Sequence, residues 1–174
     1  MPLIIFILAI AFFSIHLVVL KKKISPRYKM ELLMAYLFFF LVGIQSLFSA
    51  VAHLFYPEET AKIIGWPPGG PFQFEVGIAN LSFAVLGVLS IWFRKRFWIA
   101  VIVGYTIWLW GDAIGHIMQI IRIEDYAEGN AGVYFYSDII APFVLILSYF
   151  SYVGSVNEAK SWKRKWKHLM NHVE

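Results

Sequence analysis

An acid and a histidine lie four residues apart inside a membrane-length apolar stretch of this sequence, residues 105–119. A helix places Asp112 and His116 on one face, because they occupy positions i and i+4. Ionisable groups at membrane depth cost roughly 2.5–3.5 kcal/mol each on insertion scales, and they are kept mainly where they pair, face water or bind something. The pair therefore marks a candidate site, and its residue types suit proton transfer or metal coordination.

Composition predicts the elements that position this pair. Of the 174 residues, 60% are hydrophobic and 18% are aromatic, whereas a soluble domain is about 45–50% apolar. Each of five apolar segments is long enough to cross a bilayer as a helix. We predict an all-α integral membrane bundle of five transmembrane helices over residues 1–156 and a basic amphipathic cytoplasmic tail over 157–174. The expected spans are 2–20, 30–56, 72–93, 97–121 and 133–155.

The distribution of positive charge predicts the orientation of the bundle. Of the 15 Lys and Arg residues, all but Lys62 and Arg122 fall in the 21–29 loop, the 94–96 turn or the tail. Positively charged loops stay in the cytoplasm, so the N-terminus is expected outside and the C-terminus inside. The chain has no cysteine, which excludes disulfides, thiolate metal ligands and a cysteine nucleophile.

Depth along the helices brings further polar residues to the level of the pair. At 1.5 Å per residue, Asp112 lies about 15 Å and His116 about 9 Å below the outer end of the fourth span. Glu75 and Asn80 lie about 6 Å and 14 Å below the outer end of the third span. The outer half of the bundle is thus expected to collect the strongly polar side chains of four helices: His53, Glu75, Asn80, Asp112, His116 and Asp138.

Two kinds of ligand suit these side chains. Carboxylates and imidazoles offer N and O ligands to a divalent transition metal, and dense aromatic residues at the same level suit a small lipid-like molecule. Single residues also have ordinary structural explanations, such as an interfacial Glu75 or an Asn80 that bonds between helices. The candidate metal ligands are His53, Glu75, Asp112, His116 and Asp138. The candidate ligand-binding residues are Glu75, Asn80, Trp108, Asp112 and His116.

Three classes of function stay open. The first is a binding or catalytic site in the outer half, the second a proton- or cation-coupled carrier or channel, and the third a structural subunit of a membrane complex or oligomer. A carrier needs polar groups across the inner half, where the sequence offers few. Gly111 and Gly115 are expected to form a close helix-packing face. The tail is expected to bind the anionic cytoplasmic leaflet, with Trp162, Trp166 and Met170 on one face, and nothing indicates nucleic-acid binding.

The segment GPFQFEVGIANL at residues 70–81, together with Gly111-Asp112 and Gly115-His116, resembles a family of small polytopic prokaryotic membrane proteins classified as a domain of unknown function. The resemblance is concentrated in the third and fourth spans. It implies a helical membrane fold and a location in a prokaryotic plasma membrane, and it implies no reaction.

Overall fold

The computed structural model describes residues 1–20, 24–69 and 71–170, with side chains as far as Ser161. No strand occurs in these residues, and the model confirms the all-α prediction with five helices long and apolar enough to cross a membrane. These five are Pro2–Val19, Pro26–Phe55, Phe72–Leu89, Arg96–Ile123 and Glu128–Ser161.

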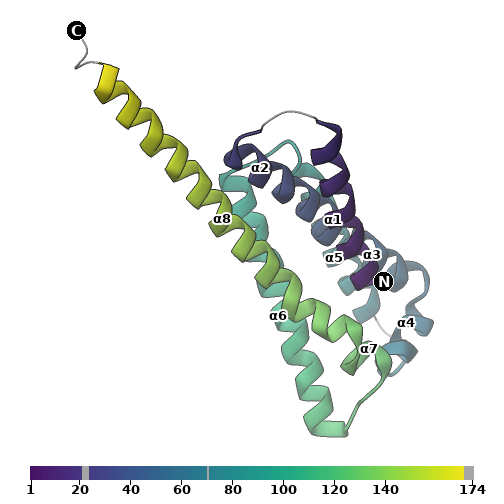
Figure 1. Ribbon diagram of the computed structural model, residues 1–174. Helices are drawn as coiled ribbons and strands as arrows, with labels where there is room; N and C mark the ends of the chain where they lie inside the picture. The colour runs from purple at the N-terminus through teal and green to yellow at the C-terminus, as the bar shows by residue number, and fades with distance from the viewer. Residues whose placement is uncertain (21–23, 70, 171–174) are drawn as a thin grey trace.

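The spans run alternately up and down, so the connections gather at two ends (Figure 1). The N-terminus and two short helices, α4 and α7, lie at one end, which we call the α4–α7 end. The α1 to α2 and α5 to α6 connections lie at the opposite end, and α8 extends beyond the bundle there. The elements are α1 (Pro2–Val19), α2 (Pro26–Leu37), the π-helix η1 (Phe38–Ile44), α3 (Gln45–Phe55), α4 (Pro57–Ile64), α5 (Phe72–Leu89), α6 (Arg96–Ile123), α7 (Glu128–Ala131) and α8 (Val133–Met170).

Proline and glycine define the ends of α4, a helix inside the segment expected to be a loop. Pro57 begins α4, a position where its missing N–H and fixed φ suit a helix. Glu58 and Glu59 occupy the first turn, where acids are favourable next to the helix dipole. Gly65 ends the helix at φ 87°, a conformation that glycine adopts without steric cost.

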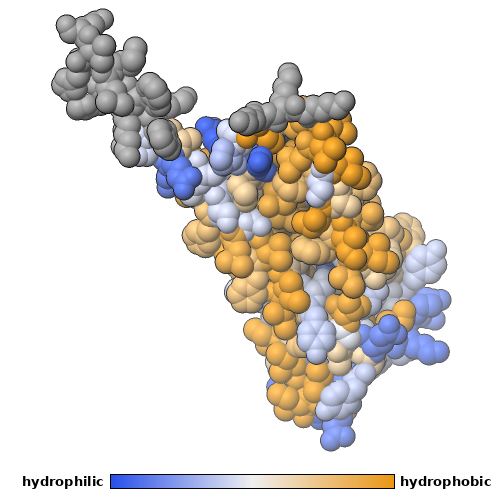
Figure 2. Space-filling model, viewed as in Figure 1, coloured by the Kyte–Doolittle hydropathy of each residue, from blue (hydrophilic) through white to orange (hydrophobic). Residues whose placement is uncertain are grey.

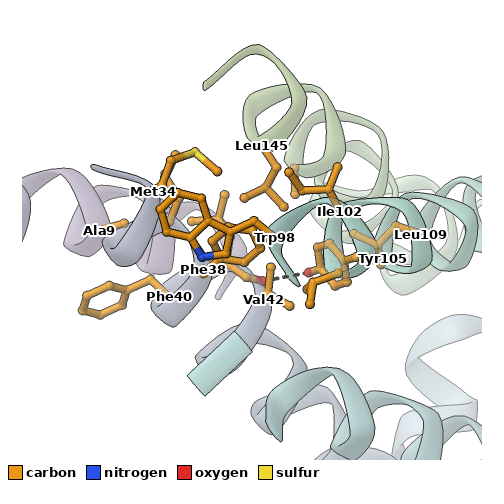
Figure 3. Close-up of a cluster of buried hydrophobic side chains, with 14 of the residues drawn as sticks. Ala9, Met34, Phe38, Phe40, Val42, Trp98, Ile102, Tyr105, Leu109 and Leu145 are labelled. Atoms are coloured by element: carbon orange, nitrogen blue, oxygen red, sulfur yellow. Dashed lines mark hydrogen bonds between the residues drawn. The ribbon is translucent and has the colours of Figure 1, made fainter. Parts of the chain in front are cut away.

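The hydrophobic core is formed by buried side chains of α1, α2, η1, α6 and α8, and Figure 3 shows part of it. Trp98 is fully buried, stacks on Phe38 at 5.6 Å between ring centroids, and donates its indole N–H to the Ser90 carbonyl at 2.8 Å. Tyr105 donates its hydroxyl to the Leu41 carbonyl of η1 at 2.7 Å. This bond ties α6 to the π-helix in the middle of the bundle.

Glycine allows α5 to approach η1 closely. A Cβ placed on Gly87 would overlap the backbone at Val42 and Gly43, so only glycine fits there. The predicted packing face at Gly111 and Gly115 is wrong, because a Cβ at either position would meet nothing within 4 Å. The prediction fails because Gly111 and Gly115 lie on a side of α6 that no other helix in the described part of the chain contacts.

The outer surface of the bundle is apolar. Figure 2 shows a wide hydrophobic band between polar regions at the two ends. Large side chains within it are openly exposed, including Ile107 at 71% and Leu147 at 63%. A surface of this size and character suits contact with lipid.

The fifth span and the first part of the predicted tail form one helix, since α8 continues without a break to Met170. The side chains of Trp162, Trp166 and Met170 lie outside the residues whose side chains are described. Their predicted apolar face stays a prediction.

Candidate functional site

A cavity of about 320 Å³ lies at the α4–α7 end of the bundle. Side chains of α3 and α5 form one wall, and side chains of α6 and α8 form the other. The N-terminal turn of α1 contributes at the side, and α4 and α7 contribute at the end. The helices of each wall pack mainly against each other, α3 with α5 and α6 with α8. The cavity therefore separates two helix pairs.

Helical spacing explains why polar residues of each span meet at this cavity. On α3, Gln45, Ser49 and His53 recur every four residues and share a face. On α6, Asp112 and His116 do the same. Since η1 directly precedes α3, the polar face begins where the hydrophobic core ends.

The structure brings five of the predicted residues to the cavity and leaves two outside it. His53, Asn80, Asp112, His116 and Asp138 all line it. The two residues that do not line it are Glu75 and Trp108.

Glu75 and Trp108 fail to reach the cavity for different reasons. Glu75 is exposed on α5, because it precedes the cavity-lining Val76 by one residue, a rotation of about 100° around the helix. Trp108 packs against the core next to Phe83, with ring centroids 6.2 Å apart. Its indole N–H is buried without a hydrogen-bond partner.

Asn130 fixes the hydrogen-bonding state of His116. Asn130 is fully buried, and its amide donates to the carbonyls of Asp125 at 2.8 Å and His116 at 3.4 Å. These two acceptors orient the NH₂ group, so the amide oxygen faces His116 Nδ1 at 2.6 Å and must accept from it. The hydrogen-bond network thus assigns the proton to Nδ1 and leaves Nε2 toward the cavity.

Asp138 faces the other nitrogen of the same ring. His116 Nε2 lies 3.7 Å from Asp138 Oδ2, and the two side chains are only 10% and 15% exposed. A bare nitrogen lone pair opposite a carboxylate would be repulsive. A proton on either Nε2 or the carboxyl group removes that repulsion. Asn130, His116 and Asp138 therefore form a row in which His116 Nε2 and the Asp138 carboxyl group can share a proton beside the cavity.

His53 repeats part of this arrangement on α3. Its Nδ1 lies 2.5 Å from the side-chain oxygen of Gln73, which is buried on α5. Each of the two histidines that line the cavity thus has its Nδ1 hydrogen-bonded to a side-chain amide oxygen. Such a partner orients an imidazole and sets which nitrogen is available for chemistry.

Reasoning from the sequence did not assign Asn130 a part in the site. Asn130 lies between Gly129 and the small residue Ala131, and a Cβ on Gly129 would come within 2.8 Å of the Ile63 carbonyl. A small residue on each side of a polar amide is the signal that could have indicated a closely packed, buried position.

Helices α4 and α7 close the end of the cavity. The glycine contact just described packs α7 directly on α4. Thr60 of α4 donates its hydroxyl to the Ala52 carbonyl of α3 at 2.9 Å. Thr60 and Gly129 both line the cavity, so these two helices separate it from the polar surface of that end.

Acidic and imidazole side chains line the cavity. Asp112 and Asp138 line it, and no Lys or Arg does so in the described part of the chain. Over the same residues, no three His, Asp or Glu side chains form a group that could hold a metal ion. The wall offers paired acid and imidazole groups with neutral hydrogen-bonding side chains, an arrangement suited to acid–base chemistry.

Comparison with known proteins identifies the family. The model of a family of unknown function, DUF6790, matches residues 1–155, so the chain belongs to that family. This confirms the resemblance to a family of unknown function. No curated protein and no solved structure matches the chain.

Proposed function

We propose that this member of the DUF6790 family binds a small hydrogen-bonding molecule inside the membrane and transfers a proton to or from it through His116 and Asp138. The observation that carries the proposal is the buried row of Asn130, His116 and Asp138 beside a cavity of about 320 Å³. Cavities of this size fall at the lower end of the range for small-molecule sites.

Each member of the row has a separate part in the proposed transfer. Asn130 holds the imidazole in one orientation through Nδ1. His116 Nε2 then exchanges a proton with Asp138 or with a bound molecule in reach of both. Gln45, Ser49 and Asn80 line the same cavity and supply neutral hydrogen bonds that orient the molecule.

The position of the core favours a one-sided site over a carrier. Trp98, Phe38 and Leu145 are fully buried in the half of the bundle opposite the cavity. An ion crossing that half would leave water and hydrogen bonds behind, at a cost of several kcal/mol or more. We therefore infer a binding and proton-transfer site at one end of the bundle, and no path for an ion through the bundle.

The proposed orientation places the cavity in the outer half of the membrane, with the N-terminus outside. Among the Lys and Arg residues that the structure describes with side chains, Lys62 and Arg122 are the two that lie toward the α4–α7 end, as expected for an external face. Single cysteines at Glu59 and Lys160, in this cysteine-free chain, should react with a membrane-impermeant maleimide from opposite sides. Reaction of both from the same side would refute the orientation.

The function is tested on molecules that copurify with the protein in mild detergent. We expect mass spectrometry of an organic extract to find a molecule enriched with the wild-type chain and depleted in Asp138→Asn and His116→Gln. His16→Gln is the matched control, because His16 bonds to Tyr36 at 2.9 Å and does not line the cavity. The control should retain the molecule.

Proton transfer needs a second measurement on the same material. Addition of the extracted molecule to protein labelled with ¹⁵N at histidine should change the protonation of His116 Nε2 in nitrogen NMR spectra of the wild-type chain, and not in those of Asp138→Asn. Binding without any change in the His116 signals would leave a binding site and refute the acid–base role. Equal recovery from all three variants would refute the site itself.

A further inference from the structure

An apolar groove runs from the polar cavity along the outside of the bundle. It has a volume of about 250 Å³ and lies between α1, η1 and α8. Leu3 and Ile140 line it and are 61% and 55% exposed, so it opens on the lipid-facing surface. Pro2 and Gln45 line both the groove and the cavity, which makes the two spaces adjoining parts of one site.

We propose that the ligand is a single-chain amphiphile whose head group occupies the cavity and whose hydrocarbon chain lies in the groove between α1 and α8. This inference rests on the proposed function, because it places the head group next to His116 and Asp138. It adds the chemical class of the ligand and its route of entry, which is sideways from the bilayer.

The dimensions of the groove suit one chain of one leaflet. Its lining on α8 extends from Val133 to Val144, a rise of about 16 Å. This is close to half of the roughly 30 Å hydrocarbon thickness of a bilayer. A chain lying there would point from the α4–α7 end toward the membrane centre, in the same direction as the lipids of the leaflet next to the cavity.

The charges of the cavity define the head group. Asp112 and Asp138 line it, and among the described residues no Lys or Arg does so. An acidic head group such as a carboxylate or phosphate would be buried beside these two carboxyl groups with no Lys or Arg side chain to pair with it, which is strongly unfavourable. A hydroxyl or an amine can donate hydrogen bonds to the carboxyl groups and to neutral side chains, so the head group is a neutral or cationic donor.

Gln45 and Ser137 mark the boundary between the two spaces. Gln45 donates its side-chain N–H to the Ser137 hydroxyl at 2.7 Å, joining α3 to α8. Ser137 lines only the groove, whereas Gln45 lines both spaces. A polar pair at this point matches the place where the head group of an amphiphile meets its chain.

The test uses photocrosslinking in vesicles of a neutral phospholipid. Three probes carry the same sixteen-carbon chain with a mid-chain diazirine, and they end in a primary amine, an alcohol or a carboxylate. The variant Ile140→Trp fills the groove at an exposed position. Leu147→Trp is its matched control, because Leu147 is a lipid-exposed residue of the same helix that does not line the groove.

We expect the amine and alcohol probes to label peptides that contain Leu3 and Ile140, at least fivefold above other lipid-facing peptides. Labelling should fall at least fivefold in Ile140→Trp and stay unchanged in Leu147→Trp. Uniform labelling of the lipid-facing surface, or labelling insensitive to Ile140→Trp, would overturn the groove assignment. Equal labelling by the carboxylate probe would overturn the head-group assignment.

Failure of this inference differs from failure of the proposed function. If the amount of a copurifying molecule falls in His116→Gln but is unchanged in Ile140→Trp, the ligand has no chain in the groove. That result refutes this inference and leaves the proposed function standing. If neither substitution affects any bound molecule, the proposed function falls as well.

Discussion

Replacing Asn130 with alanine should disturb both the stability of the bundle and the proton position on His116. Asn130 is fully buried and accepts from His116 Nδ1 while donating to two backbone carbonyls. The substitution leaves the His116 Nδ1 N–H and the Asp125 carbonyl without a partner, whereas the His116 carbonyl keeps its backbone bond within α6. Each buried group left unsatisfied costs about 1–3 kcal/mol.

The expected loss is at the lower end of that sum, because His116 has an alternative. The ring can release its Nδ1 proton and keep the proton that Nε2 shares with Asp138 Oδ2, 3.7 Å away. We therefore expect Asn130→Ala to lower stability by roughly 2–4 kcal/mol. For a chain of this length that is a fall of about 4–16 °C in melting temperature.

Thermal unfolding in detergent and nitrogen NMR of histidine-labelled protein measure the two effects. Asn130→Asp keeps an acceptor for His116 Nδ1 and removes both donors, so it should lower the melting temperature while leaving the proton on Nδ1. Asn80→Ala is the control, because the Asn80 amide donates only to the Val76 carbonyl of its own helix, and it should cost about 1 kcal/mol or less. An unchanged melting temperature and an unchanged tautomer in Asn130→Ala would refute the assigned role.

Three further changes are testable by melting. Gly87→Ala should destabilise by roughly 1–3 kcal/mol, because the new methyl group overlaps the backbone at Gly43, whereas Gly111→Ala meets open space and should be neutral or stabilising. Lys95→Gly should raise the melting temperature by relieving a φ of 63°, and Lys95→Ala, which removes the same charge, should not. Glu31→Gln should lower the free energy of unfolding by up to about 1 kcal/mol, because it removes two ion pairs. The loss should be smaller at high salt, and a loss that does not depend on salt would contradict this explanation.

Sequence reasoning could predict the level of each polar residue but not the direction in which it points. Depth follows from a fixed rise per residue, and Asn80 and Asp112, predicted at matching levels, line one cavity. Direction depends on how each helix is rotated by packing against its neighbours. Glu75 has the right depth and faces outward, and Gly111 is a small residue whose face has no neighbour.

Interactions between distant segments were also beyond the sequence. The bond from Asn130 to His116 requires α7 to lie against α6, and Gln73 reaches His53 only because α5 packs on α3. Composition and hydropathy do not record such neighbours. Composition and hydropathy did predict the number of spans. In lipid the backbone N–H and C=O groups must bond to each other, and a single apolar segment of this length achieves that only as a helix.

Because the cavity lies between two helix pairs, one motion of the bundle disturbs less close packing than any other, namely the tilting of one pair relative to the other. Gly77 of α5 packs closely on Leu54 of α3, and a load that bends either pair must break close packing. A load that tilts one pair away from the other is opposed by a few contacts between the pairs. These are the Tyr105 bond to η1, the Gln45–Ser137 bond between α3 and α8, and the packing of Gly129 on α4. The most compliant motion of this bundle is therefore the one that widens its polar cavity.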